Sequence, residues 1–262
     1  MQTEKYLQDY YQSYNENGRL QTRHGMIEFL TTMRYIERYL QPGMRVIEIG
    51  AGTGRYSHAL AQKGYQVDAV ELVAHNIEQF QADTLQNEPV TIRQGNALDL
   101  SDFADNTYDI TLLLGPMYHL YEQADQTKAL SEAIRVTKPG GVIFVAYCMA
   151  DPSIIDFAFR SGQIDFCIEQ GLLDTETFAV TSRPEDLFEL YRVEEITALR
   201  EQFAATPLHL VAADGYARHM KDTLAAMDDR TYQLYLAYHF ATCERIELLG
   251  YSHHTLDIFR KE

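Results

Sequence analysis

Short apolar segments and helical segments alternate across residues 46–147, and this alternation restricts the fold more than any other feature of the chain. Apolar runs that we expect to be strands occupy residues 46–49, 67–72, 90–93, 108–114 and 142–147, and segments that we expect to be helices occupy 55–63, 73–85 and 124–137. Strands joined by helical segments of about 10–15 residues form right-handed crossovers. The sequence therefore predicts an α/β fold with a parallel sheet, whose ligands bind outside the carboxyl ends of the strands.

The segments on either side of this region complete the predicted organisation. Residues 20–40 have apolar side chains at helical spacing, and the Gln-Pro-Gly sequence at 41–43 ends that helix. Residues 151–206 are expected to be mainly helical, most clearly at 183–203, and residues 223–247 are expected to form a helix. Strand character returns at 208–215 and at 253–261, where Leu256 and Ile258 share one face. We divide the chain into an N-terminal helical cap (1–43), a ligand-binding core (44–150), a helical insertion or lid (151–206) and a C-terminal completion of the sheet (207–262).

Composition excludes several classes of protein. The chain has 262 residues, 46% of them hydrophobic, which suits one compact domain. Its net charge of -16 disfavours phosphate backbones as partners. No apolar run approaches the roughly 20 residues that span a bilayer, and the polar N-terminus does not resemble a signal peptide. The three cysteines lie far apart, which fits a cytoplasmic protein without structural zinc.

Three glycines follow the first apolar run, in the segment Gly50-Ala51-Gly52-Thr53-Gly54. A dinucleotide fingerprint requires a GxGxxG pattern, whereas here the third glycine comes one position early and Arg55 follows it. Glu48 precedes the loop, and a carboxylate there is unfavourable beside a pyrophosphate. The same carboxylate suits a positively charged ligand, or an acceptor for the backbone donors of the loop. The loop therefore favours a nucleoside ligand that lacks phosphates and carries an ammonium and a sulfonium group.

Five motifs occur in order between residues 44 and 147. They are VIEIGAGTG (46–54), VDAVEL (67–72), GNALDL (95–100), YDITLLLGPMYHL (108–120) and RVTKPGGVIFVAY (135–147). Together they resemble the class I S-adenosylmethionine-dependent methyltransferases. The resemblance implies a Rossmann-like methyltransferase fold, with a mostly parallel seven-stranded sheet, helices on both faces and an insertion after the fifth strand. Within that class, GPMYHL, the N-terminal segment 10–20 and the C-terminal segment 243–261 look like a group of small bacterial enzymes with a GPxYHL segment.

The resemblance also assigns expected roles to residues of the strand ends. Gly50, Ala51, Gly52 and Gly54 are expected to approach the cosubstrate closely, Glu71 to accept from both ribose hydroxyls, and Leu72 to lie beside it. Asn96 is expected to accept from the adenine amino group and Ala97 to donate its amide, with Asp99 as a neighbouring candidate. The Leu114 carbonyl and Gly115 are expected beside the methionine part. Tyr11, Tyr14 and Arg19 are candidates for covering the cosubstrate, with Arg19 pairing with its carboxylate.

His119 and Tyr118 are the candidates for acceptor chemistry. The methyl group of S-adenosylmethionine is already activated by the positive sulfur, so an enzyme of this class mainly aligns an in-line displacement that yields S-adenosylhomocysteine. A general base is needed only where the nucleophile must lose a proton. We expect His119 to act as a base or to orient the acceptor, and Tyr118 to form a wall of the acceptor pocket.

Other features of the sequence limit or extend this hypothesis. No HExxH or comparable spacing supports a metal site, and His253 and His254 fall in the closing strand, where a structural role is expected. The insertion contains 12 Asp or Glu against 4 Arg. This acidity fits a cationic or amine acceptor and fits equally a solvated helix face.

Three functions are compatible with these observations. The leading one is a methyltransferase acting on a small molecule, as a monomer or homodimer without nucleic acid or membrane partners. The second is an RNA or protein methyltransferase, although the segment after the fourth strand lacks most of the tetrad of base-modifying enzymes. The third is a non-catalytic protein that binds S-adenosylmethionine, because a fold does not determine a function.

Overall fold

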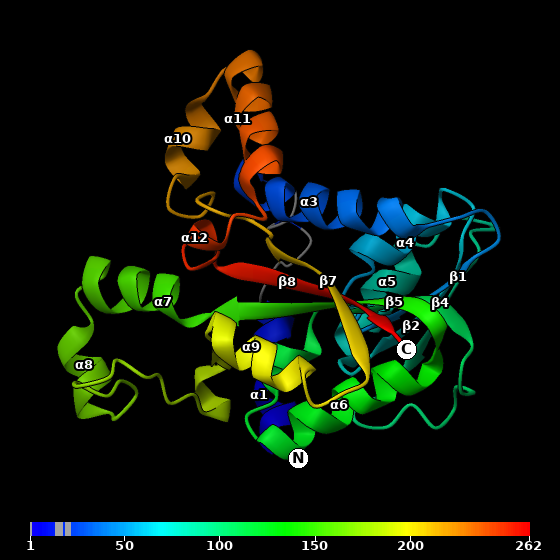
Figure 1. The fold of residues 1–262 in the computed structure, drawn as a ribbon, viewed down its shortest axis with the longest axis horizontal. Helices are drawn as coiled ribbons and strands as arrows, with labels where there is room; N and C mark the ends of the chain where they lie inside the picture. The colour runs from blue at the N-terminus through cyan, green and yellow to red at the C-terminus, as the bar shows by residue number, and fades with distance from the viewer. Residues whose placement is uncertain (1, 14–17, 19–21) are drawn as a thin grey trace.

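The structure is a computed structural model that describes residues 2–13, 18 and 22–262. Its centre is one sheet with the strand order β3-β2-β1-β4-β5-β8-β7 (Figure 1). The strands on this path are β1 (Arg45–Ile49), β2 (Gln66–Glu71), β3 (Val90–Gln94), β4 (Tyr108–Leu113), β5 (Thr137–Met149), β7 (Ala205–Ala212) and β8 (His254–Lys261). The first five pair in parallel, and β8 runs antiparallel to both β5 and β7. The predicted mostly parallel sheet of seven strands is confirmed along this path, and a short eighth strand joins it beside β5.

Helices cover both faces of the sheet. The helices that alternate with the strands or flank them are α1 (Gln2–Ser13), α3 (Arg23–Tyr39), α4 (Arg55–Ala61), α5 (Ala74–Asp83), α6 (Gln123–Val136), α9 (Val193–Arg200) and α12 (Ile246–Leu249). One buried cluster joins α6 and α9 to the sheet, and a second joins α3, α4 and α12 to it. In β5, Ile143 and Val145 belong to the first cluster, whereas Val142 and Phe144 belong to the second. This alternation is the period-two pattern of a strand buried on both faces.

The insertion after β5 differs from the predicted run of helices. It contains the short helices α7 (Ala150–Ser153) and α8 (Ile164–Glu169), a π-helix η2 (Ile154–Arg160), a 3-10 turn η3 (Pro184–Asp186) and the strand β6 (Leu190–Tyr191). The expected helix over 183–203 is therefore wrong in its first half. There β6 pairs in parallel with the last two residues of β5, Cys148 and Met149. Since β5 extends beyond β4, its free edge offers backbone partners that outweigh local helix propensity.

The helix expected over 223–247 is also divided. The chain forms α10 (Lys221–Ala226), α11 (Asp229–Thr242) and α12 in succession. Asp228 begins a new helix at this break, because its Oδ1 accepts from the Thr231 amide at 2.8 Å. Figure 1 shows α10 and α11 rising from one face of the sheet beside α3, and α7 and α8 lying beyond the tip of β5. The carboxyl ends of the parallel strands therefore face the insertion.

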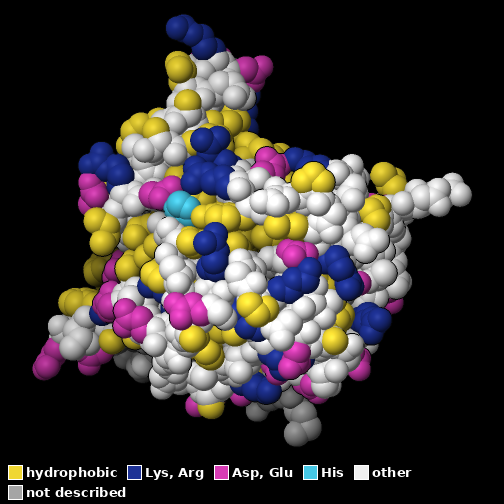
Figure 2. Space-filling view, turned by 45° about the vertical axis from the view of Figure 1, so that its right-hand side comes forward, with side chains coloured by type: hydrophobic (Ala, Val, Ile, Leu, Met, Phe, Trp, Pro, Cys, Tyr) yellow, Lys and Arg dark blue, Asp and Glu magenta, His cyan; other side chains and the backbone are white. Residues whose placement is uncertain are grey.

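The molecular surface carries charge of both signs around apolar areas (Figure 2). In the described part of the chain, no helix has the length and apolar character needed to cross a bilayer.

A 3-10 turn, η1 (Pro116–His119), follows β4 and holds the two residues expected to serve acceptor chemistry.

Candidate functional site

The glycine loop between β1 and α4 is packed so that side chains are excluded at two positions. Gly50 has φ +76°, and a Cβ there would lie 2.6 Å from Cδ of Pro116. Gly54 has φ +88°, and its Cβ would lie 2.4 Å from the ring of Phe80. Both positions therefore require glycine. At Gly52 a Cβ would meet nothing within 4 Å, so this residue borders open space.

The amides of the loop are bonded to the neighbouring strand. Gly50 and Ala51 donate to the Val70 carbonyl at 2.8 and 3.0 Å, and Gly52 donates to Oε2 of Glu71 at 2.8 Å. These bonds fix the loop against the carboxyl end of β2.

Glu71 ends β2 and is 6% exposed. Its Oε1 accepts from the Val73 amide at 2.9 Å and from Nδ2 of Asn76 at 3.3 Å. Burial raises the pKa of Glu71, and these bonds oppose that shift. The carboxylate is thus oriented before any ligand arrives, and its predicted bond to a ribose stays a prediction.

Glu48 has a different environment from the one expected. It is 2% exposed and accepts from the hydroxyl and the amide of Ser57, near the start of α4. The amides of Gly50, Ala51 and Gly52 donate elsewhere, so the alternative in which Glu48 accepts from them is wrong. Burial raises the pKa of Glu48 to about 8, which leaves the carboxyl mainly neutral at pH 7.

One cavity of about 660 Å³ opens at the carboxyl ends of β1, β2 and β4. Twelve residues that the sequence analysis selected at or after strand ends line it together: Glu48, Gly50, Ala51, Gly52, Glu71, Leu72, Asn96, Ala97, Leu114, Gly115, Tyr118 and His119. Gly54 lies behind this wall, where it packs against Phe80. The volume is within the range of small-molecule sites.

The loop after β3 supplies Asn96 and Ala97 to the cavity. Oδ1 of Asn96 accepts from the Leu98 amide at 3.0 Å, which fixes the orientation of its side chain. Asp99 accepts from the Ser101 amide at 3.0 Å and is not among the residues that line the cavity. The structure therefore favours a turn-forming role for Asp99 over contact with a ligand.

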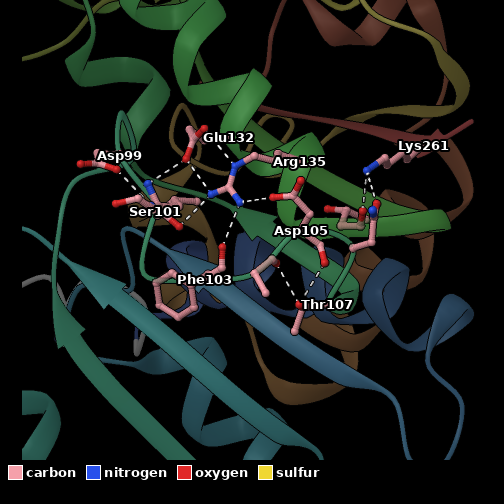
Figure 3. Close-up of polar contacts among 12 residues, drawn as sticks. Asp99, Ser101, Phe103, Asp105, Thr107, Glu132, Arg135 and Lys261 are labelled. Carbon is pink, nitrogen blue, oxygen red and sulfur yellow. Dashed lines mark hydrogen bonds and ion pairs between the residues drawn. The ribbon is translucent and has the colours of Figure 1, made fainter.

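Arg135 of α6 bonds to the continuation of this loop over residues 100–105 (Figure 3). Its guanidinium donates to the carbonyls of Leu100 at 2.8 Å and Phe103 at 2.9 Å, and it pairs with Asp105 at 2.6 Å and Glu132 at 2.8 Å. The bonds to Arg135 lower the pKa of Glu132 to about 2. One side chain thus ties the segment that carries Asn96 to a helix of the core.

Tyr118 and His119 lie side by side in η1. The Tyr118 hydroxyl donates to the Leu114 carbonyl at 2.9 Å. His119 Nδ1 lies 2.7 Å from the Leu187 carbonyl and must donate to it, so Nε2 accepts from the Tyr11 hydroxyl 3.0 Å away. Burial lowers the pKa of His119 to about 4. These contacts favour an orienting role for His119 over that of a general base.

The N-terminal candidates are only partly described. Tyr11 on α1 lines the cavity together with His119, to which its hydroxyl is hydrogen bonded. Tyr14 and Arg19 lie outside the described residues.

Sequence reasoning missed several residues that line the cavity. Arg55 does so at the start of α4, with its guanidinium 4.5 Å from the Phe29 ring. Its buried Nε has no hydrogen-bond partner among the described residues. Arg183 from the insertion and Glu28 from α3 also line the cavity. Arg55 was detectable from its place directly after the loop, whereas Glu28 lies on a helix with no local signal.

The strand order and the glycine loop define a Rossmann-like fold, and a cavity lies at the carboxyl ends of its parallel strands. Residues 47–145 match a family model described as a methyltransferase domain. This segment, less than half of the chain, is thus similar to methyltransferase domains. A solved structure of a methyltransferase from Thermotoga maritima has the same fold, with a TM-score of 0.58 and 16% identity over 99% of this chain and 100% of that one.

Individual relatives support the same assignment. A demethylmenaquinone methyltransferase from Renibacterium salmoninarum is 35% identical over 106 residues, 40% of this chain and 41% of that protein. A ubiquinone biosynthesis O-methyltransferase from Leptothrix cholodnii is 24% identical over 147 residues, 55% of this chain and 60% of that protein. The chain thus spans about half the length of these curated relatives. The structure of the CcbJ methyltransferase from Streptomyces caelestis shares the fold, with a TM-score of 0.59 and 14% identity over 100% of this chain and 98% of that one.

Proposed function

We propose that this chain transfers the methyl group of S-adenosylmethionine to a small-molecule acceptor by in-line displacement, releasing S-adenosylhomocysteine. The observation that carries the proposal is one shared cavity, because the glycine loop and Glu71 line it together with Tyr118 and His119. A ligand on the loop and an acceptor beside η1 would therefore occupy the same cavity. Two relatives, the demethylmenaquinone methyltransferase and the ubiquinone biosynthesis O-methyltransferase, carry names that refer to small molecules.

The residues of the cavity fit this cosubstrate. Gly52 leaves open space where a ribose or methionine chain would pass, and the carboxylate of Glu71 is already oriented toward that space. The buried Nε of Arg55 matches a carboxylate, whose geometry suits a guanidinium. We assign the ribose hydroxyls to Glu71, the carboxylate to Arg55 and the adenine to the segment of Asn96.

The cosubstrate supplies an electrophilic methyl group on a positively charged sulfur. The residues of the chain position the cosubstrate and the acceptor and shield both from water. Leu114 and Gly115 line the cavity, and the hydrogen-bonded Tyr11–His119 pair forms part of its wall. Because His119 is neutral with both ring nitrogens engaged, it orients the wall and accepts no proton near pH 7.

The charges around the cavity argue against a nucleic-acid acceptor. Its wall contains five carboxyl groups, on Glu28, Glu48, Glu71, Glu122 and Asp125, and burial keeps that of Glu48 mainly neutral at pH 7 by raising its pKa to about 8. Two arginines, Arg55 and Arg183, are the basic residues among the described lining. A phosphate backbone requires the opposite balance. The unpaired, buried cysteines also support our proposal of a cytoplasmic enzyme.

Two measurements test the proposal. Calorimetry with S-adenosylhomocysteine should show binding to the purified chain, weakened by Glu71→Gln. Incubation with methyl-labelled S-adenosylmethionine should then label a small-molecule extract and leave total RNA unlabelled. Labelled RNA would reverse the proposed acceptor class. Binding without any labelling would indicate a non-catalytic protein.

A further inference from the structure

The carboxamide of Asn96, in the loop after β3, has a fixed orientation at the wall of the cavity. The Leu98 amide lies 3.0 Å from its Oδ1. A backbone N–H only donates, so the atom that meets it is the carboxamide oxygen, and Nδ2 is the other end of the group. In the described part of the chain no acceptor is bonded to Nδ2, and this nitrogen is not one of the enclosed side-chain atoms that lack a partner. Since Asn96 lines the cavity, the wall presents an accessible N–H donor at this residue.

The amide of Ala97 is a second donor beside the first. Ala97 is 8% exposed and also lines the cavity. The next two amides are bonded within the loop, that of Leu98 to Oδ1 of Asn96 and that of Asp99 to the Asn96 carbonyl at 3.0 Å. The Ala97 amide, in contrast, has no acceptor among the residues that the structure describes. Because buried backbone N–H groups are nearly always paired, this amide indicates a ligand that brings an acceptor.

A hydrogen bond joins this loop to the end of β2. The Gly95 amide donates to the Glu71 carbonyl at 3.0 Å. A nucleoside that binds Glu71 through its ribose therefore has the two donors within reach of the group next to the ribose. Leu72 and Leu98 line the same cavity, and an apolar wall with a few polar groups suits a flat heterocyclic base.

The two donors match the ring nitrogens of adenine and do not match its amino group. The ring nitrogens carry lone pairs and accept hydrogen bonds, whereas the amino group donates them. An amino group opposite Nδ2 of Asn96 would place one donor against another. A donor that loses its partners in this way weakens binding.

We propose that Asn96 binds the adenine of the cosubstrate by donating from Nδ2 to a ring nitrogen, beside the Ala97 amide, and that the site does not select the amino group. The sequence predicted the opposite polarity, in which Asn96 accepts from that amino group. This inference rests on the proposed function and deepens it, because it names the part of the base that Asn96 contacts.

The first experiment compares two ligands on the wild-type chain. Calorimetry measures the affinity for S-adenosylhomocysteine and for its deamino analogue, in which purine replaces adenine. The two affinities should agree within about threefold, because the lost amino group has no acceptor in the site. An analogue that binds about tenfold more weakly than S-adenosylhomocysteine would show that the amino group is bound, and would overturn the proposal.

The second experiment exchanges the donor for an acceptor. Asn96→Asp keeps the oxygen that accepts from Leu98 and replaces Nδ2 by an oxygen of similar size. This variant should bind S-adenosylhomocysteine about tenfold more weakly, or worse, because an oxygen would then face the lone pair of a ring nitrogen. Asn87→Asp is the matched control, since it adds the same charge at an exposed residue outside the cavity lining and should change the affinity less than about twofold.

Two outcomes of the second experiment overturn the proposal. An equal or higher affinity in Asn96→Asp would show that this residue accepts from the base, as the sequence predicted. An equal loss in Asn87→Asp would assign the effect to charge alone. The comparison of ligands requires no variant, so it decides the question even where Asn96→Asp fails to fold. Failure of the wild-type chain to bind S-adenosylhomocysteine is a separate result, which rejects the proposed function itself.

Discussion

Replacement of Glu48 by glutamine should remove a pH-dependent loss of stability. Glu48 is fully enclosed beside Ser57, and burial raises its pKa from 4.5 to about 8. Below pH 4.5 the carboxyl is protonated in both the folded and the unfolded chain, so its titration has no effect. Between pH 4.5 and 8 only the unfolded chain ionises, and rising pH therefore favours unfolding through this group. Above pH 8 the contribution is constant.

The size of this loss in unfolding free energy follows from the width of the pH range between the two pKa values of Glu48. Each pKa unit corresponds to about 1.4 kcal/mol, and the group titrates only partly at the two ends of the range, so the wild-type chain loses about 3–4 kcal/mol at this site between pH 5 and pH 8. Glu48→Gln keeps an acceptor for the Ser57 hydroxyl and does not titrate. The variant should match the wild type at pH 5 within about 1 kcal/mol and exceed its stability at pH 8.

Urea denaturation followed by circular dichroism at pH 5, 6, 7 and 8 measures this difference. Other titrating groups occur in both proteins, so their contributions cancel in the difference between the two unfolding free energies. Glu176→Gln, which removes an exposed carboxylate from the insertion, controls for the loss of one charge. A difference between Glu48→Gln and wild type that stays constant from pH 5 to pH 8 would refute the reasoning.

Three further predictions concern the loop, the predicted ribose ligand and a buried ion pair. Gly54→Ala should reduce the unfolding free energy by about 2 kcal/mol or more in urea titrations, because φ +88° and the Phe80 ring both oppose a Cβ. An equally stable variant would show that the loop can move aside. Glu71→Gln should weaken the binding of S-adenosylhomocysteine about 10- to 100-fold, because charge-assisted hydrogen bonds to the ribose hydroxyls are lost. Calorimetry measures this change, and an unchanged affinity would show that Glu71 does not bind the ribose. Arg200→Ala should cost about 3–5 kcal/mol, because it leaves the fully buried Asp257 without its partner at 2.5 Å. Thermal unfolding of Arg200→Ala and of the double variant that also carries Asp257→Leu tests this, and the single variant should be the less stable of the two.

The predicted fold agreed with the structure where local pattern and tertiary pairing favour the same element. The apolar runs beginning at Val46 and Val67 became adjacent parallel strands, as their spacing indicated. The pattern was misleading at Leu190 and Tyr191, which lie in a helix-forming sequence and pair instead with the end of β5. Strand pairing depends on a backbone partner that is distant in the sequence, and the periodicity of the local sequence does not indicate that partner.

The candidate site likewise contains residues that local sequence predicted and residues that only tertiary packing brings to it. The twelve lining residues found from the sequence lie at or just after strand ends, where the parallel topology brings them to one edge. Glu28 and Arg183 belong to other segments, so their place at the cavity depended on how α3 and the insertion pack. The sequence also assigned Glu48 the properties of an ionised carboxylate, although its burial favours the neutral form.

The order of apolar runs and glycines determined the parallel sheet and the edge at which the cavity opens, because these features are encoded at short range along the chain. Tertiary structure alone decided the protonation of Glu48 and His119 and the meeting of Glu28, His254 and Asp214. The pKa of an ionisable side chain depends on its burial and on the groups that surround it. Both the burial and the surrounding groups are established only when segments far apart in the sequence pack together.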